Sequence, residues 1–185
     1  MRILLGFAPF IVFALLSRYV PASVSLWAAA AVSAALVLRE KIRGRSIKIL
    51  ETGTFVLFAL LGLYISLTHG AWDIPTVRSV VDGGLLFIIL LSLLIRRPFT
   101  LQYAREQVPA AAQSSPTFVR TNYIITTAWA LAMAIIVVAD LAMHFVTRLP
   151  VRVEVAVIVA ALGGAFWFSK WYPKTKHSPH APAID

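Results

Sequence analysis

Six long apolar stretches constrain what this chain can fold into more than any other feature of its sequence. They cover residues 3–20, 22–38, 50–68, 74–96, 123–146 and 151–168. Each approaches the roughly 20 residues that a helix needs to cross the ~30 Å hydrocarbon layer of a bilayer. None shows the alternation of polar and apolar residues that is typical of membrane-barrel strands. The sequence therefore predicts an all-α, polytopic membrane protein with six transmembrane helices, arranged as three hairpins.

The composition excludes an ordinary water-soluble protein. Hydrophobic residues make up 59% of the chain and charged residues 14%, whereas soluble domains carry about 45–50% apolar and about 25% charged residues. The chain has no cysteine. Disulfides, thiolate nucleophiles and cysteine-ligated metal centres are therefore excluded as well.

The basic residues predict how the helices are oriented. The chain carries 17 lysines and arginines against 8 acidic residues, a net charge of +9. With the amino terminus in the cytoplasm, 13 of the 17 fall on the cytoplasmic side, and only Arg18, Arg78, Arg148 and Arg152 fall outside. Because cytoplasmic loops are enriched in Lys and Arg, this split favours a cytoplasmic location for both termini. The excess of positive charge then requires no nucleic-acid partner.

A cleaved signal peptide is the alternative interpretation of the first apolar stretch. Arg2, the apolar run and the sequence Val20-Pro21-Ala22-Ser23 resemble such a peptide and its cleavage site. Pro21 next to the cleavage position and Arg18 within the run argue against it. We therefore expect the first stretch to be a membrane helix.

We also predict the structure or contacts of three segments outside the spans. A basic loop between the second and third spans predicts contacts with anionic lipid headgroups, where each charge contributes about 1 kcal/mol, or alternatively a docking surface for a partner. Its basic residues are Arg39, Lys41, Arg43, Arg45 and Lys48. Residues 98–108 predict a short amphipathic helix that lies at the membrane interface with Phe99 and Tyr103 in lipid. Residues 173–185 predict a disordered cytoplasmic tail.

Asp140 is the clearest ionisable residue inside an expected span. His144 follows it by one helical turn, Arg148 by two, and Glu154 begins the sixth span. Because charges inside a bilayer are costly, such residues are functional candidates, and Asp140, His144 and Glu154 could form a proton-relay or cation site near the outer face. The competing hypothesis is structural, since Arg148 could neutralise Asp140 through successive i+4 steps.

Small residues at helical spacing predict close helix packing. Ala156, Ala160 and Gly164 recur at every fourth position of the sixth span, and Ser25, Ala29 and Ser33 do so in the second. Such faces let helix backbones approach closely in lipid. They either pack inside the chain or form the contact face of a homo-oligomer.

The sequence contains no catalytic or cofactor-binding motif. It lacks a paired nucleophile and base, a phosphate-binding glycine loop and an HExxH pattern. We therefore expect no enzymatic activity, no cofactor and no metal site. A lipid-processing enzyme inside the membrane would need at least two convergent catalytic groups, and the spans offer little beyond the residues around Asp140.

Several short motifs resemble one family of bacterial membrane proteins. They are Phe7-Ala8-Pro9-Phe10, His69-Gly70-Ala71-Trp72, Arg97-Pro98-Phe99 and Ala128-Trp129. In this order they resemble the intracellular septation protein A type of inner-membrane protein. The resemblance implies a multi-pass protein of the cell envelope, tied to septation and membrane integrity through protein partners and without an established enzymatic reaction. The alternative hypothesis is a small ion or solute transporter or channel that uses Asp140 and His144.

Overall fold

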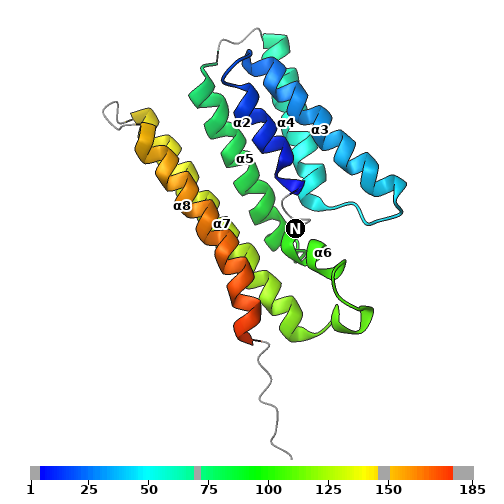
Figure 1. The fold of residues 1–185 in the computed structure, drawn as a ribbon. Coiled ribbons are helices and arrows are strands. Elements are labelled where there is room, and N and C mark those ends of the chain that lie inside the picture. Colours follow the sequence, from blue (N-terminus) through cyan, green and yellow to red (C-terminus); the bar gives the residue numbers. More distant parts are fainter. Residues whose placement is uncertain (1–4, 69–71, 146–150, 177–185) are drawn as a thin grey trace, which may run out of the picture.

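The computed structural model describes residues 5–68, 72–145 and 151–176, and every regular element in these ranges is helical. The fold class predicted from the sequence is therefore confirmed as all-α. The elements are α2 (Ala8–Leu16), α3 (Ala22–Ile42), α4 (Ile49–Thr68), α5 (Ile74–Leu94), α6 (Phe99–Arg105), the 3₁₀ turn η1 (Ala110–Ala112), α7 (Pro116–Phe145) and α8 (Val151–Lys176), as Figure 1 shows.

Five of these helices are long and apolar enough to cross a membrane. They are α3, α4, α5, α7 and α8, so five of the six expected spans have helices of spanning length. The exception is α2, whose 9 residues extend only about 14 Å at 1.5 Å per residue. Pro9 lies in its first turn and the Ser17 hydroxyl donates to the Ala14 carbonyl at its end. Leu5 and Gly6, just before α2, are also helical, and residues 3 and 4 lie outside the described residues, so α2 alone covers part of the apolar stretch of residues 3–20.

The last two helices are longer than the sequence predicts. Helix α7 begins at Pro116, ahead of residue 123, and α8 continues past residue 168 to Lys176 with Pro173 inside it. The first residues of the expected disordered tail are therefore helical, and residues 177–185 lie outside the described part of the chain. Proline is tolerated near the end of a membrane helix where neighbouring groups satisfy the backbone.

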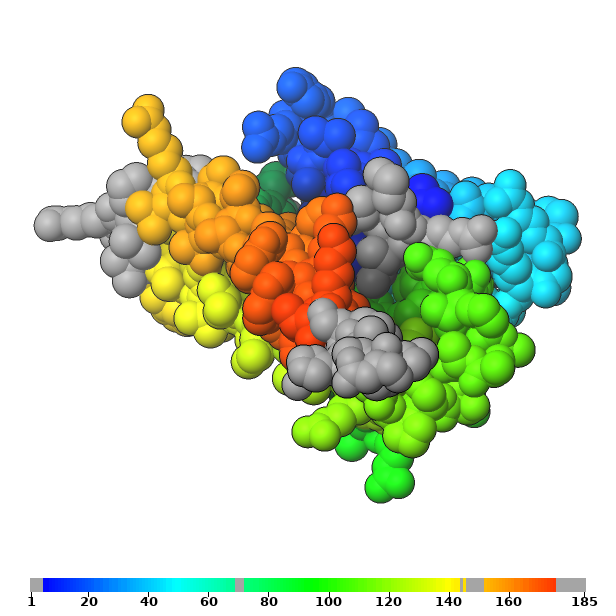
Figure 2. Space-filling model, turned by 60° about the horizontal axis from the view of Figure 1, so that its bottom comes forward, coloured from blue at the N-terminus to red at the C-terminus, as the bar shows by residue number. Residues whose placement is uncertain are grey.

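Helix α5 joins two halves of the bundle (Figure 1). Its first half contributes Val77 and Val81 to a core with α2, α3 and α4, in which Phe58 lies 5.1 Å from Phe10 between ring centroids. Its second half contributes Leu85 and Ile89 to a core with α7. Helix α8 packs mainly on α7, so the α7–α8 hairpin forms one side of the molecule and the α3–α4 hairpin the other (Figures 1 and 2).

Glycines set the close contact between α4 and α5. A Cβ on Gly53 would lie 2.9 Å from Ile88 Cγ2, and one on Gly84 would overlap Leu57. Absence of a side chain at these two positions lets the helix backbones approach, which is the usual basis of tight packing in lipid.

Helix α6 does not lie in the interface as an independent amphipathic helix. Phe99, Leu101 and Tyr103 are buried against the bundle, and the Thr100 hydroxyl donates to the Asn122 carbonyl of α7 at 2.9 Å. The expectation that Phe99 and Tyr103 enter lipid is therefore wrong, because α5 and α7 offer this apolar face a protein surface to cover. Helix α6 closes one end of the bundle (Figure 1).

Candidate functional site

The structure assembles four charged residues near one end of the bundle, which we name the Asp140 cluster. It contains Asp140 of α7, Glu154 of α8, and Arg78 and Asp82 of α5. These side chains meet because the end of α7 and the beginnings of α5 and α8 lie at the same end of the bundle (Figure 1). Arg148 and the side chain of His144 lie outside the described residues.

Within the Asp140 cluster, one acid is paired and another is not. Arg78 Nη2 donates to Glu154 Oε1 at 3.0 Å. Asp140 is only 6% exposed, and among the described residues neither of its carboxylate oxygens has a hydrogen-bond partner of standard geometry. The carboxyl group of Asp82 lies close enough to interact with that of Asp140, and Arg78 and Glu154 act on Asp140 through space. Burying a charged group without a hydrogen bond is costly. Asp140 is therefore the strongest candidate for a functional polar residue in the described spans.

An apolar cavity of about 510 Å³ adjoins the Asp140 cluster. It lies between α2, α5, α7 and α8, with Arg78 and Asp82 among its lining residues and Met133 and Ile136 on its α7 side. Trp129 also lines it, stacks on Phe7 at 4.9 Å between ring centroids, and donates from Nε1 to the Ser169 hydroxyl at 2.9 Å. An apolar cavity therefore lies directly beside Asp82, whose carboxyl group interacts with that of Asp140.

A second charged group, the Lys48 network, lies at the opposite end of the bundle. Its cation is Lys48, which is 2% exposed. Lys48 Nζ donates to Glu40 Oε2 at 2.8 Å, pairs with Glu106 Oε1 at 3.0 Å and lies 3.9 Å from Glu51 Oε1. The Tyr103 hydroxyl donates to Glu51 Oε1 at 3.2 Å. The network joins the end of α3, the start of α4 and the residues of α6, so it fixes three elements to one another.

The surroundings of the Lys48 network shift the pKa of two groups outside the spans. Burial opposes the charge of Lys48, but hydrogen bonds to Glu40 and Glu106 more than offset it and raise the pKa of the ammonium. Burial, followed by the negative charge of Glu51, raises the pKa of the Tyr103 hydroxyl. Both shifts keep Lys48 charged and Tyr103 neutral at physiological pH.

The position of Lys48 differs from the headgroup contact that its sequence predicts. Its ammonium is enclosed by carboxylates because the turn after α3 folds back over Glu40. Arg39 and Arg45 are partly buried and also approach Glu40, at 3.0 and 3.8 Å. Lys41 and Arg43 are exposed. Lys48 also lies 3.9 Å from Glu51, three residues further along the chain.

The two small-residue faces have different surroundings. Ser25, Ala29 and Ser33 of α3 are completely buried, and α3 packs on α4. Ala156, Ala160 and Gly164 of α8 are exposed, and a Cβ placed on Gly164 would meet no atom within 4 Å. The first face therefore packs inside the chain, whereas the second is open to lipid or to another protein.

Sequence reasoning missed the acidic partners of Lys48 and the contribution of α6. Glu40 lies eight residues before Lys48, and Glu106 lies in a distant segment after α6. Neither acid is therefore three or four residues away from Lys48 on one helix. One signal was present: Glu40 is an acid within a strongly basic segment, which is a pattern that favours local charge pairing. Asp82 and Arg78 lie one helical turn apart in α5, and the structure brings Asp140 and Glu154 close to them.

The geometry defines a helical membrane protein with charged groups at both ends of its bundle, and the described residues form no recognisable catalytic centre. Among the same residues, no three His, Asp or Glu side chains are grouped so that they could hold a metal ion. Comparison of the chain with protein-family models, with curated proteins and with solved structures gives no match.

Proposed function

We propose that this chain is a non-enzymatic protein of the bacterial inner membrane that acts by binding other membrane proteins. The observation that carries the proposal is the exposed face of α8 formed by Ala156, Ala160 and Gly164. Inside the molecule, the corresponding face of α3 is covered by a neighbouring helix. In lipid, an uncovered small-residue face is a surface on which a second helix can pack closely.

Further apolar side chains flank this face of α8. Val153, Val159 and Trp167 are exposed beside it, and α8 is the span with the smallest buried share. Helix α8 therefore offers more uncovered surface than the other spans. A helix of a different membrane protein or a second copy of this chain could occupy it.

The topology that we propose for this function has six crossings with both termini in the cytoplasm. The distribution of Lys and Arg supports it. In this topology α2 crosses together with the residues that flank it, and the Lys48 network lies on the cytoplasmic side. A role in septation or envelope integrity rests on the resemblance of Arg97-Pro98-Phe99 and the other short motifs to the septation protein A type.

Photocrosslinking in native membranes tests this function. A photoreactive amino acid in place of Ala160 should give discrete protein adducts, and the matched probe in place of Leu131, an exposed residue of α7 outside this face, should give none. Adding the substitution Gly164→Leu on the same face should abolish the Ala160 adduct, because the larger side chain prevents close approach. Absence of protein adducts at Ala160, or adducts that persist with Gly164→Leu, would overturn the proposal.

A second candidate function is the transport of protons or small cations. The observation that favours it is the buried Asp140 carboxylate, which lacks a hydrogen-bond partner among the described residues and faces Asp82 beside an apolar cavity. Paired carboxyl groups in a membrane can hold a proton or a cation. In this function His144 relays the proton toward the membrane surface.

Proton flux into vesicles that contain the purified protein tests the second function. Asp140→Asn should abolish the flux, because an amide cannot exchange the proton. Asp73→Asn, at an exposed acid near the start of α5, is the matched control and should leave the flux unchanged. Equal flux in the wild type and Asp140→Asn would exclude transport through this site.

A further inference from the structure

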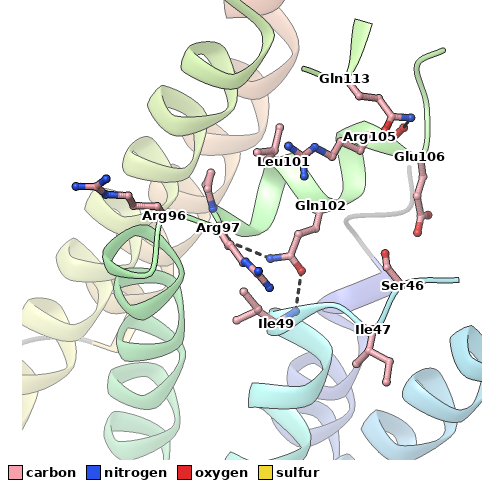
Figure 3. A pocket seen from close by; sticks show the side chains of 11 residues that line it. Ser46, Ile47, Ile49, Arg96, Arg97, Leu101, Gln102, Arg105, Glu106 and Gln113 are labelled. Atoms are coloured by element: carbon pink, nitrogen blue, oxygen red, sulfur yellow. Dashed lines mark hydrogen bonds between the residues drawn. The ribbon is translucent and has the colours of Figure 1, made fainter. Parts of the chain in front are cut away.

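A polar pocket of about 550 Å³ lies at the same end of the bundle as the Lys48 network and shares Glu106 with it (Figure 3). We name it the arginine pocket. Its walls come from the residues just before and at the start of α4, from the turn that joins α5 to α6, and from α6 itself. Arg96, Arg97 and Arg105 contribute three guanidinium groups to its lining.

Positive charge predominates in the arginine pocket. Among the described lining residues, three guanidinium groups face one carboxylate, that of Glu106, and Lys48 pairs with this carboxylate at 3.0 Å. The ion pairs found in the described part of the chain involve none of the three arginines. The pocket therefore presents a net positive charge to whatever enters it. Guanidinium groups bind phosphate and carboxylate through paired hydrogen bonds.

Hydrogen bonds hold the walls of the arginine pocket in place. The backbone N–H of Ile49 donates to Gln102 Oε1 at 2.9 Å, and Gln102 Nε2 donates to the Arg97 carbonyl at 3.1 Å. Gln113 Nε2 donates to the Arg105 carbonyl at 3.0 Å. In Figure 3, Arg97 and Arg105 lie on either side of Gln102, whereas Arg96 points away from them. These bonds thus fix the backbone at Arg97 and Arg105, from which the two guanidinium groups extend.

The surroundings of the arginine pocket indicate that it lies at the level of lipid headgroups. The candidate span α5 ends at Leu94, which is 79% exposed, and Arg96 and Arg97 follow directly after it. Ile47 lines the pocket and is 54% exposed. Exposed apolar side chains therefore adjoin the guanidinium groups, an arrangement that suits a ligand with an anionic head and an apolar tail and does not suit a free ion.

From these observations we propose that the arginine pocket binds the phosphate of an anionic membrane phospholipid. Arg97 and Arg105 donate charge-assisted hydrogen bonds to the phosphate oxygens, and Ile47 contacts the apolar part of the lipid next to the headgroup. This site is distinct from the protein-binding face of α8 and from the Asp140 cluster.

Lipid binding to the full-length chain in detergent micelles tests the proposal. Native mass spectrometry should show that the wild type retains phosphatidylglycerol in preference to phosphatidylcholine. Arg97→Gln with Arg105→Gln should weaken phosphatidylglycerol binding by roughly 30-fold, since each removed charge contributes about a factor of five. Arg18→Gln with Arg120→Gln, which removes two exposed charges outside the pocket and outside the basic loop, is the matched control and should change binding little.

Two further measurements distinguish a bound phospholipid from nonspecific charge attraction and from a soluble phosphate. Arg97→Lys with Arg105→Lys keeps both charges but loses the planar guanidinium, so it should fold as the wild type does and bind with intermediate affinity. Equal retention of the two lipids, or equal weakening by the control pair, would overturn the proposal. Displacement of bound phosphatidylglycerol by inorganic phosphate at millimolar concentration would assign the pocket to a soluble phosphate and would also overturn it.

Discussion

The α3–α4 and α7–α8 hairpins are built from similar sequence features but differ in how completely those features are satisfied. Each hairpin carries a small-residue face and a buried acid near one end. In the α3–α4 hairpin the small residues are covered and Glu40 pairs with Lys48 at 2.8 Å. In the α7–α8 hairpin the face of Ala160 is exposed, and the buried Asp140 faces a second acid, Asp82, and forms no salt bridge among the described residues.

This difference suggests a division of roles within the molecule. Groups that are covered and paired contribute to the stability of the fold, and changing them should unfold it. A charged group that is buried without a counter-ion costs free energy, and a small-residue face that no helix covers lacks the close packing contacts that stabilise helix pairs in lipid. Such groups are the ones for which a partner, a ligand or a proton is expected. Substitutions of equal size in the two hairpins should therefore have unequal effects.

The largest effect is expected from Lys48→Met. Removing the ammonium takes from the buried Glu40 its closest cation and leaves only the partly exposed Arg39 and Arg45 near it. Breaking a buried ion pair in this way costs about 3–5 kcal/mol. Arg43→Met, at an exposed position of the same loop, should change the free energy of unfolding by less than about 0.5 kcal/mol. Denaturant unfolding in detergent measures both, and equal stability of the two variants would contradict the structural role of Lys48.

A smaller effect is expected from Ala29→Leu. Ala29 is completely buried, so a larger side chain should force α3 and its neighbours apart and cost about 1–3 kcal/mol. Ala160→Leu makes the same change on the exposed face of α8 and should leave the free energy of unfolding unchanged in the purified chain. Should Ala160→Leu destabilise the purified chain as much as Ala29→Leu, the contrast between the two faces would be wrong.

High pH should destabilise the α3–α4 side of the molecule. The raised pKa of Lys48 means that its ion pairs stabilise the fold fully below the ordinary value of 10.5 and are lost as pH rises through the raised value. The raised pKa of Tyr103 acts in the same direction, because the unfolded chain ionises near pH 10.0 and the buried hydroxyl does not. Melting temperatures in detergent should be level from neutral pH to about 10 and decrease above it. A level profile at higher pH would contradict the role of the Lys48 network in stability.

The smallest effect on stability is expected from Asp140→Asn. The amide keeps the shape of the side chain, can still hydrogen-bond to the carboxyl group of Asp82, and removes a charge that forms no salt bridge among the described residues. The free energy of unfolding should therefore change by less than about 1 kcal/mol or increase. Glu40→Gln, which removes the charge from a paired acid, should destabilise the chain clearly more. Equal losses in the two variants, measured by the same unfolding assay, would show that Asp140 is paired as Glu40 is.

The sequence predicted the helical class and located five helices of spanning length because long apolar runs determine both directly. Among the described residues of the first apolar stretch, α2 is too short to span a membrane by itself, and hydropathy does not show that Pro9 falls in its first turn. The sequence predicted the wrong environment for Lys48 and Tyr103. Their partners come from elements distant along the chain, and local charge patterns carry no information about which distant elements meet.

The residues of the Asp140 cluster were predicted only in part. Asp140 and Glu154 stood out as ionisable residues near or within apolar stretches, and the structure brings both close to Arg78. That Arg78 pairs with Glu154 and that Asp82 faces Asp140 depends on how α5 packs against α7 and α8. Small-residue spacing likewise predicted close packing on both α3 and α8, but it could not tell which face has its partner inside the chain.

A crosslinking scan along α8 in native membranes tests the central claim most directly. Photoreactive probes at each position from Val153 to Gly164 would report which face of the helix contacts protein. We predict protein adducts that peak at Ala156, Ala160 and Gly164 and are weak between them, because these residues share one face at a period of about four. Adducts distributed evenly along the helix, or found on no face, would contradict a protein-binding role for α8.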